Sequence, residues 1–371
     1  MRRWKTSSLM TIGLGLAAWL AAYTLAAQPA PPSGAFRVDL PEGAPVALVT
    51  ADWGQSQVAP RGGALQVDLR STLLLKNTTQ RRIRGVSMLV LAQEVAAGGK
   101  ASVTVPALDV APGEAFPLRV DVRLMRPGAA GGTLVEVKLD GVLFEDLTFY
   151  GPNRLNSRRT MMAWELEARR DRKVLLAMVE RGGAAALRDE MVAVLGRLAA
   201  MPRLDIQVAR AGRATAQQST PVRFAALSMP GAPVELTSAE VVASGGELRI
   251  PRIEMLNRGA RGIRFVDVGW QARDREGRQF VAGSLPAQVQ LPAKARVTVE
   301  RDQAYRITVA GSRPPDFAEV RGFAGLVEFD DGEIWVPPAA TSAVTGEQQR
   351  LAELYRRKGI EAVAAELKRL R

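Results

Sequence analysis

The sequence predicts a mainly β protein with helices, in which two β-sandwich domains follow one another in tandem and a helical connector separates them. Segments in both halves alternate apolar and polar residues, which is the pattern of a half-buried antiparallel sheet. Landmark residues of the first half return in the same order in the second half, 180 to 188 residues later. Self-similarity at a nearly constant offset is typical of an internal duplication. The chain is therefore expected to hold two copies of one β domain.

The N-terminal segment predicts export. Its first five residues carry three positive charges and the apolar run Ser8–Ala22 follows, as in the charged and hydrophobic regions of a signal peptide. Residues 1–27 are predicted to be a signal peptide cleaved before Gln28, or an uncleaved anchor over residues 9–27, a stretch close to the ~20 residues of a membrane-spanning helix. A proline-rich linker, residues 28–35, comes next. Because the positive charges stay inside, the remainder is expected in the periplasm or outside the cell, attached to the inner membrane in the anchored case.

The first β domain is predicted at residues 36–156. The inward-facing residues of its two clearest strands are Leu69, Ser71, Leu73 and Leu75, then Val86, Met88, Val90 and Ala92. Further short strands are expected at 101–105, 116–122, 134–139 and 142–150. The total of about seven strands is the number expected of an immunoglobulin-like sandwich.

Residues 157–202 predict the helical connector. Ser157 is placed to cap its first helix, which Gly182 and Gly183 end. A second amphipathic helix follows and stops just before Pro202. We expect the two helices to form a hairpin whose apolar faces pack on each other or on a sandwich.

The second β domain, residues 203–338, repeats the landmarks of the first. The matching positions are Gly43 and Gly231, Gly62 and Gly245, Asn77 and Asn257, Ile83 and Ile263, and Phe144 and Phe329. The inner face of its clearest strand, Val266 to Ala272, matches the strand from Val86 to Ala92 in register. Several landmarks in one order are hard to obtain by chance, so the sequence predicts a tandem duplication.

Residues 339–371 are predicted to be a linker and a helical tail. Apolar residues recur at helical spacing on both sides of Gly359, which separates two short helices. The tail is expected either to dock on the preceding domain or to bind a protein partner or a membrane surface. In the second case the contact residues would be Leu351, Leu354, Tyr355, Val363 and Leu367.

The second domain carries a pattern that resembles a known family. Asn257-Arg258, the alternating strand Val266–Asp274 and the turn Arg275–Arg278 together resemble FxLYD-like domains, which are small immunoglobulin-like β-sandwich modules of exported bacterial proteins. The first domain keeps Asn77 and the strand but has a different turn. The whole layout is similar to exported bacterial proteins of unknown function with tandem repeats of this kind. The resemblance implies the sandwich fold and an exported location, and it implies no reaction, because such sandwiches host many functions.

Composition excludes several classes of chemistry. The chain has no histidine and no cysteine, so imidazole bases, thiolate nucleophiles, disulfides and cysteine zinc sites are excluded. The net charge is +12, with arginines scattered through strands and loops rather than gathered in a patch. An anionic envelope polymer or a membrane surface is therefore a candidate partner, whereas nucleic acid is not expected.

Two acidic clusters recur at equivalent places. They are Glu145-Asp146 and Asp330-Asp331-Gly332-Glu333. Asp330, Asp331 and Glu333 could supply oxygen ligands to Ca²⁺, a hard cation. The same residues also suit a β-turn, in which Asp accepts backbone hydrogen bonds and glycine takes a positive φ. The turn is the expected structure, because a calcium loop needs more ligands at defined spacing.

These observations predict a protein with no catalytic residue and no cofactor. We expect a non-enzymatic binding or scaffolding protein of the bacterial envelope, with a protein as its partner. The alternative is a carboxylate-dependent hydrolase acting on envelope polysaccharide, as most glycoside hydrolases use paired carboxylates. Its nearest candidates are Glu145, Asp146, Glu165 and Glu167, although Glu165 and Glu167 are also spaced for surface ion pairs with nearby arginines.

Overall fold

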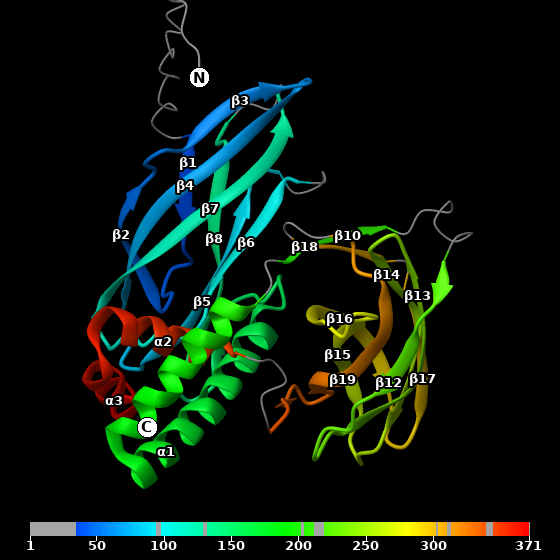
Figure 1. Ribbon diagram of the computed structural model, residues 1–371. Helices are drawn as coiled ribbons and strands as arrows, with labels where there is room; N and C mark the ends of the chain where they lie inside the picture. The colour runs from blue at the N-terminus through cyan, green and yellow to red at the C-terminus, as the bar shows by residue number, and fades with distance from the viewer. Residues whose placement is uncertain are drawn as a thin grey trace, which may run out of the picture.

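The computed structural model describes residues 35–93, 98–128, 132–201, 204–210, 219–301, 303–309, 313–338 and 344–370. Over these residues the protein is mainly β, with three helices and four sheets (Figure 1). The predicted export segment, residues 1–27, lies outside the described residues. Within the described ranges, none of the helices combines the length and apolar character that a membrane span requires.

The first unit has two sheets around one core. One sheet has the order β1-β8-β5-β6, with β9 added to β8, and consists of β1 (Phe36–Asp39), β5 (Ile83–Leu91), β6 (Lys100–Val105), β8 (Val135–Phe144) and β9 (Phe149–Tyr150). The other is centred on β4 and consists of β2 (Val46–Asp52), β3 (Gln57–Arg61), β4 (Ala64–Asn77) and β7 (Ala115–Pro127). The unit thus contains nine described strands where about seven were predicted.

The second unit also has two sheets. The first consists of β10 (Leu204–Arg210), β11 (Thr220–Pro221), β13 (Val234–Ser244), β14 (Glu247–Asn257), β17 (Arg296–Glu300) and β18 (Gln303–Val309). The other has the order β12-β19-β15-β16, with β20 added to β19, and consists of β12 (Arg223–Ala226), β15 (Ile263–Asp274), β16 (Gln279–Leu291), β19 (Phe317–Phe329) and β20 (Ile334–Trp335).

The two units share one plan of strand pairing. Strands β1 and β12 pair in parallel with β8 and β19, and the short strands β9 and β20 fold back on the same partners. Ile83 pairs with Phe144 in the first unit and Ile263 pairs with Phe329 in the second. Both pairings are followed at once by a β-bulge. Residues that match in the sequence therefore occupy equivalent positions in the two sheets.

The predicted core positions are buried. Leu69, Leu73 and Leu75 of β4 and Met88 of β5 are fully buried in the core between the two sheets of the first unit. However, every residue of β5 is buried, not only those of the inner face. The outer face is covered because a helix packs on it: a Cβ added to Gly85 would meet the Met161 sulfur at 2.7 Å.

A pair of asparagines holds equivalent loops in the two units. Asn77 is fully buried, and its amide nitrogen donates to the carbonyl oxygens of Arg81 (2.8 Å), Val110 (3.2 Å) and Ala111 (3.1 Å). Its carbonyl oxygen accepts from the backbone N–H of Thr79. Asn257, also fully buried, repeats this set with Arg261, Leu291, Pro292 and Gly259. The recurrence of this asparagine in the sequence therefore has a structural cause.

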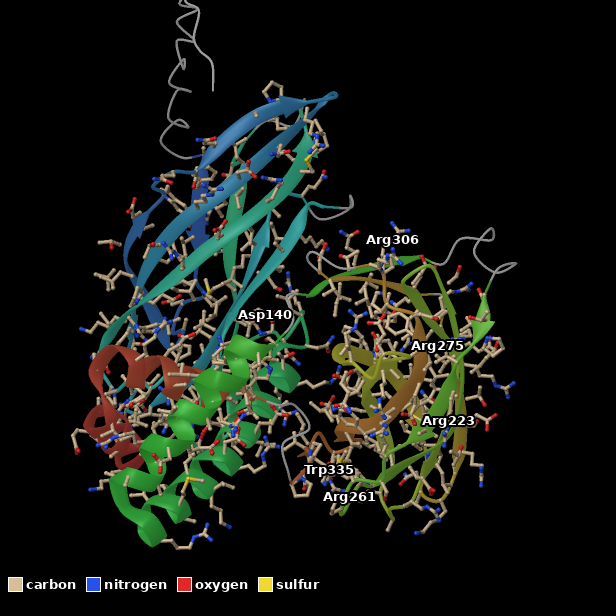
Figure 2. All side chains as sticks on the ribbon, viewed as in Figure 1. Asp140, Arg223, Arg261, Arg275, Arg306 and Trp335 are labelled. Atoms are coloured by element: carbon tan, nitrogen blue, oxygen red, sulfur yellow. The ribbon has the colours of Figure 1, made fainter. Side chains whose placement is uncertain are left out.

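The prediction of two separate strands at 134–139 and 142–150 was wrong. The structure has one strand, β8, that runs through Asp140, where the pairing with β5 shifts register. The bulge turns the Asp140 carboxylate toward the start of the next helix (Figure 2), where it accepts from Ser157 Oγ at 2.6 Å and from the backbone N–H of Arg154 at 2.7 Å. The Asp140-Gly141 pair, which separates the two predicted strands, forms a bulge that anchors a helix.

The connector is α1 (Ser157–Ala200), whose helical backbone is interrupted at Gly183 (φ 65°, ψ −163°). The segments before and after this glycine lie side by side, so α1 is a hairpin (Figure 1). The predicted cap at Ser157 was wrong by one residue. Asn156 is the N-cap, and the Ser157 hydroxyl is buried on Asp140 instead.

The tail forms α2 (Gly346–Lys358) and α3 (Ile360–Arg369), with Gly359 between them. Both helices lie beside the α1 hairpin (Figure 1) and share an apolar cluster with it. The cluster consists of Leu175, Leu187, Met191 and Val194 of α1 and Leu351, Ala352, Ile360, Val363 and Leu367 of the tail. The tail is thus docked, but on the α1 hairpin rather than on the preceding β domain, which was the docking site predicted.

Replacing Thr345 by Ala is expected to destabilise the protein by about 1–2 kcal/mol. Its hydroxyl accepts from the backbone N–H of Gln348, whose side chain accepts in turn from the Thr345 N–H, which forms a capping box at the start of α2. The same hydroxyl donates to buried Asp171 of α1 at 2.5 Å. Urea unfolding measures the loss, and Thr345→Ser should restore most of it. An unchanged midpoint for the alanine variant would contradict this role.

Candidate functional site

The residues considered for a metal form a turn. Gly332 has φ 85° and its N–H donates to the carbonyl of Phe329, which closes the turn between β19 and β20. Asp331 and Glu333 both accept from the Arg261 guanidinium, at 2.6 and 2.7 Å. The backbone N–H of Glu333 and the guanidinium of Arg261 hold the pKa of Asp331 below its ordinary value. Across the described ranges, no group of three or more acidic residues is arranged to hold a metal ion.

The recurrence of the acidic clusters follows from an arginine that recurs with them. In the first unit the guanidinium of Arg81 lies 3.7 Å from the centre of the Phe144 ring and pairs with Asp146 at 3.4 Å. The second unit has the same contacts among Arg261, Phe329 and Asp331. In each case the arginine covers the ring at the end of a core strand and neutralises the turn carboxylate. The two acidic clusters are thus part of the sandwich structure.

The helical carboxylates lie in different surroundings. The predicted pair of Glu165 with Arg169 is present at 2.9 Å, but the expectation of a surface pair was wrong, because Glu165 is 3% exposed. Arg172, one further turn along, donates to the same carboxylate at 2.8 Å. Burial raises the pKa of Glu167 above its ordinary value. Glu165 lies beside Arg84 of β5 and the end of the tail, and Glu167 lies beside α2, and the local sequence of α1 reveals none of these neighbours.

The start of α1 contacts both sandwich units. Met161 and Met162 pack with Leu143 of the first unit and with Phe265 and Ile334 of the second in one apolar cluster. This contact is the reason that the first turns of α1 are buried on more than one side. The helix therefore joins the units through side-chain packing as well as through the chain.

A buried ion cluster reinforces the same contact, and we call it the Glu328 cluster. Glu328 of β19 is 3% exposed and accepts from Arg159 of α1 and from Arg264 of β15, both at 2.5 Å. Arg158 lies 3.6 Å from the same carboxylate and also donates to the carbonyl of Gly332. Burial alone would raise the pKa of Glu328, but the hydrogen bonds from Arg264 and Arg159 outweigh it and hold the pKa below its ordinary value.

A pocket of about 570 Å³ lies where the first unit, α1 and the tail meet, and we call it the junction pocket. Its polar walls come from Arg84 of β5, Glu145 of the β8–β9 loop and Glu165, Arg172 and Lys173 of α1. Leu176, Ala177 and Leu370 give it an apolar side. Its volume is within the range of small-molecule sites, roughly 300–1,000 Å³.

Three polar residues of the junction pocket are deeply buried. Arg84, Glu165 and Arg172 are 8%, 3% and 4% exposed. Their charges are paired, because Arg84 donates to Asp109 and Arg172 donates to Glu165. Nevertheless Arg84 Nε, Arg172 Nε and Glu165 Oε2 each have no hydrogen-bond partner among the described residues. Such buried atoms are costly unless something satisfies them.

The sequence did not predict the junction pocket, because its residues come from segments far apart in the chain. Glu165 was considered only as a candidate for acid–base chemistry or as a member of a surface ion pair. The usable signal was the spacing of Glu165, Arg169 and Arg172, which places all three on one face of a helix.

The remaining positive charge is dispersed. Arg223, Arg261, Arg275 and Arg306 lie at separate places on the second unit (Figure 2). Arg261, Arg275 and Arg306 pair with carboxylates of the same unit. These four described arginines therefore do not form one basic patch.

Comparisons with known proteins identify no family for this chain. No protein-family model and no curated protein matches it. Among solved structures, it is similar to a transglutaminase of red sea bream, with 9% identity over 76% of this chain and 31% of that one and a TM-score of 0.13. It is also similar to a β-glucosidase of Kluyveromyces marxianus, with 11% identity over 75% and 46% of the two chains and a TM-score of 0.15. The chain spans less than half the length of either protein, and TM-scores this low support no argument about function.

Proposed function

We propose that this chain is an exported, non-enzymatic binding or scaffolding protein of the bacterial envelope, with a protein as its partner. The main observation behind the proposal is that α1 contacts both sandwich units. An apolar cluster joins the helix to both units, and the Glu328 cluster joins it to the second. Two units held in this way present their sheets and loops to a partner in a defined relation, which is what a scaffold requires.

The shared strand pairing of the two units supports the interpretation as a tandem duplication. Equivalent residues such as Asn77 and Asn257 make equivalent contacts in both. An immunoglobulin-like sandwich, as the resemblance implies, is a fold that is widely used for binding. Export remains part of the proposal on the basis of the N-terminal charge and apolar pattern.

The carboxylate-dependent hydrolase is the alternative. That chemistry needs one carboxylic acid and one carboxylate that face the scissile bond. Glu165 accepts from two guanidiniums, and Asp146 accepts from Thr148 and Arg81. Because the best-placed carboxylates are engaged in this way, the contacts favour the binding role.

Crosslinking in cells, followed by purification of the tagged chain, tests the proposal. We expect one protein of the envelope fraction to be recovered in stoichiometric amount with the full-length chain. A variant that lacks residues 1–27 serves as the control, since it should stay in the cytosol and recover no such partner. Recovery of the full-length chain from the cytosol, or of the chain alone from the envelope, would contradict the proposal.

A further inference from the structure

Another pocket, of about 390 Å³, lies between α1, the start of α2 and the segment that follows β6, and we call it the Trp164 pocket. Trp164 and Glu167 of α1 line it, and its small or apolar lining residues are Pro106, Ala107, Ala168 and Gly346. From this arrangement we propose that the Trp164 pocket binds a small organic amine, held as its ammonium between the indole ring and the Glu167 carboxylate. The site does not depend on the scaffolding role, because its residues belong to the first unit, α1 and the tail.

Trp164 is exposed in a part of α1 that is otherwise buried. It is 51% exposed, whereas its neighbours Ala163 and Glu165 are buried. Tryptophan is a residue that folded proteins bury on average, so an indole exposed at the edge of a pocket is a candidate contact for a ligand. The face of an indole ring attracts a cation more strongly than the face of any other aromatic side chain.

Glu167 supplies a carboxylate that has no partner. The residue is half-buried and lines the pocket, and among the described residues it has no hydrogen bond and no ion pair. The arginines that follow it are paired elsewhere, Arg169 with Glu165 and Arg170 with Asp171. Burial raises the pKa of Glu167, although the charge of Arg170 acts in the opposite direction. A ligand that brings a positively charged N–H donor would satisfy this carboxylate.

The other charged residues of the Trp164 pocket have partners. Asp171 accepts from the Thr345 hydroxyl at 2.5 Å, and Arg350 donates to Glu347 at 2.8 Å. The carboxylate of Glu167 is therefore the charge in this pocket that lacks a counter-charge in contact with it. For this reason the pocket favours a cation over an anion.

Trp164 and Glu167 are close enough to share one ligand group. They lie three positions apart in α1, and side chains at this spacing on a helix are neighbours, with about 5–6 Å between their Cβ atoms. One ammonium group can therefore contact both the ring and the carboxylate. The small and apolar residues of the pocket suit the carbon skeleton that carries the ammonium.

This chemistry has two sources. A free amine and the side chain of a lysine residue in a peptide both carry an ammonium group on an apolar chain. The pocket recognises the same group in both cases, so the source is decided by comparing a free amine with a capped lysine.

Titration of the full chain, followed by NMR of its indole N–H groups, tests the site. The probes are cyclohexylamine as the free amine and N-acetyl-lysine methylamide as the lysine, and the signal of Trp164 is the one that Trp164→Leu removes. We expect this signal to shift to saturation with at least one probe. The neutral counterparts, cyclohexanol and N-acetyl-norleucine methylamide, should bind at least about tenfold more weakly, because they lack the charge. Binding of cyclohexylamine shows that a free amine is sufficient, and binding of the lysine probe alone identifies a lysine side chain as the ligand.

One variant and a matched control assign the binding to Glu167. Glu167→Gln keeps the shape of the side chain and removes its charge, and it should weaken binding of the amine at least about tenfold. Glu361→Gln, which removes an exposed carboxylate of α3, should leave binding unchanged. If Glu167→Gln fails to fold, the comparison of each amine with its neutral counterpart on the unmodified chain carries the test. Absence of a shift with both probes, equal binding of the neutral counterparts, or full binding by the Glu167→Gln variant would overturn the proposal.

Discussion

Replacing Asn77 by Asp is expected to destabilise the first unit by about 3 kcal/mol or more. The amide nitrogen of Asn77 faces three carbonyl oxygens in a fully buried site. Aspartate has almost the same shape but presents an oxygen to these acceptors, so donors are lost and a buried charge faces three partial negative charges. Urea unfolding of the purified variant measures the change.

Gln80→Glu is the matched control, because Gln80 is an exposed amide in the same turn. Converting it to an acid should change the free energy of unfolding by no more than about 0.5 kcal/mol. Asn257→Asp should destabilise as strongly as Asn77→Asp, since Asn257 donates to three carbonyls in the same way. A stable Asn77→Asp variant would mean that the loops of the first unit do not depend on this amide.

Replacing Glu328 by Gln should cost about 3–5 kcal/mol, because it leaves the guanidiniums of Arg159 and Arg264 in a buried site without their counter-charge. The shape of the side chain is preserved, so the loss reports on charge rather than on packing. Urea unfolding at pH 7 measures it. Glu333→Gln is the control, because Glu333 is an exposed carboxylate paired with Arg261, and its loss should cost at most about 1 kcal/mol. Equal effects of the two changes would contradict the role of the Glu328 cluster.

The stability that Glu328 contributes is expected to decrease at low pH. The pKa of Glu328 is lower in the folded protein than its ordinary value, so its carboxylate stabilises the folded state above the unfolded pKa, roughly 4.3. This stabilisation disappears as the pH falls through the lower folded pKa. The difference in stability between wild type and Glu328→Gln should therefore be constant from pH 7 to about pH 5 and shrink at lower pH.

Periodicity in the sequence was sufficient to predict the main strands of the first core and the central strand, β15, of the second. The alternation in Leu69–Lys76 is reproduced as buried and exposed residues of β4. The same rule failed for the outer face of β5, because a helix from a distant part of the chain covers it. The residue pattern of a strand predicts which of its faces packs in the core of its own sheets. It does not predict whether a distant helix covers the other face, because that depends on tertiary packing.

The junction pocket and the Glu328 cluster were beyond prediction for a related reason. Each brings together charged residues from three or more segments, and a charged residue in a sequence usually indicates a solvated surface. The burial of Glu165 and Glu328 depends on what lies opposite them in space. The turn at Asp330–Glu333 could be predicted, because its chemistry is local: aspartates and a glycine with positive φ are sufficient to define it.

The docking of α2 and α3 on the α1 hairpin also fixes an order of events during synthesis. The hairpin leaves the ribosome before the second unit, but the tail that covers Leu187, Met191 and Val194 is made only after that unit. Throughout this interval the apolar face of the hairpin has no tail to cover it, and exposed apolar surface is what chaperones and proteases recognise. A chain that stops before α2 would retain this exposed face, which would mark it for degradation.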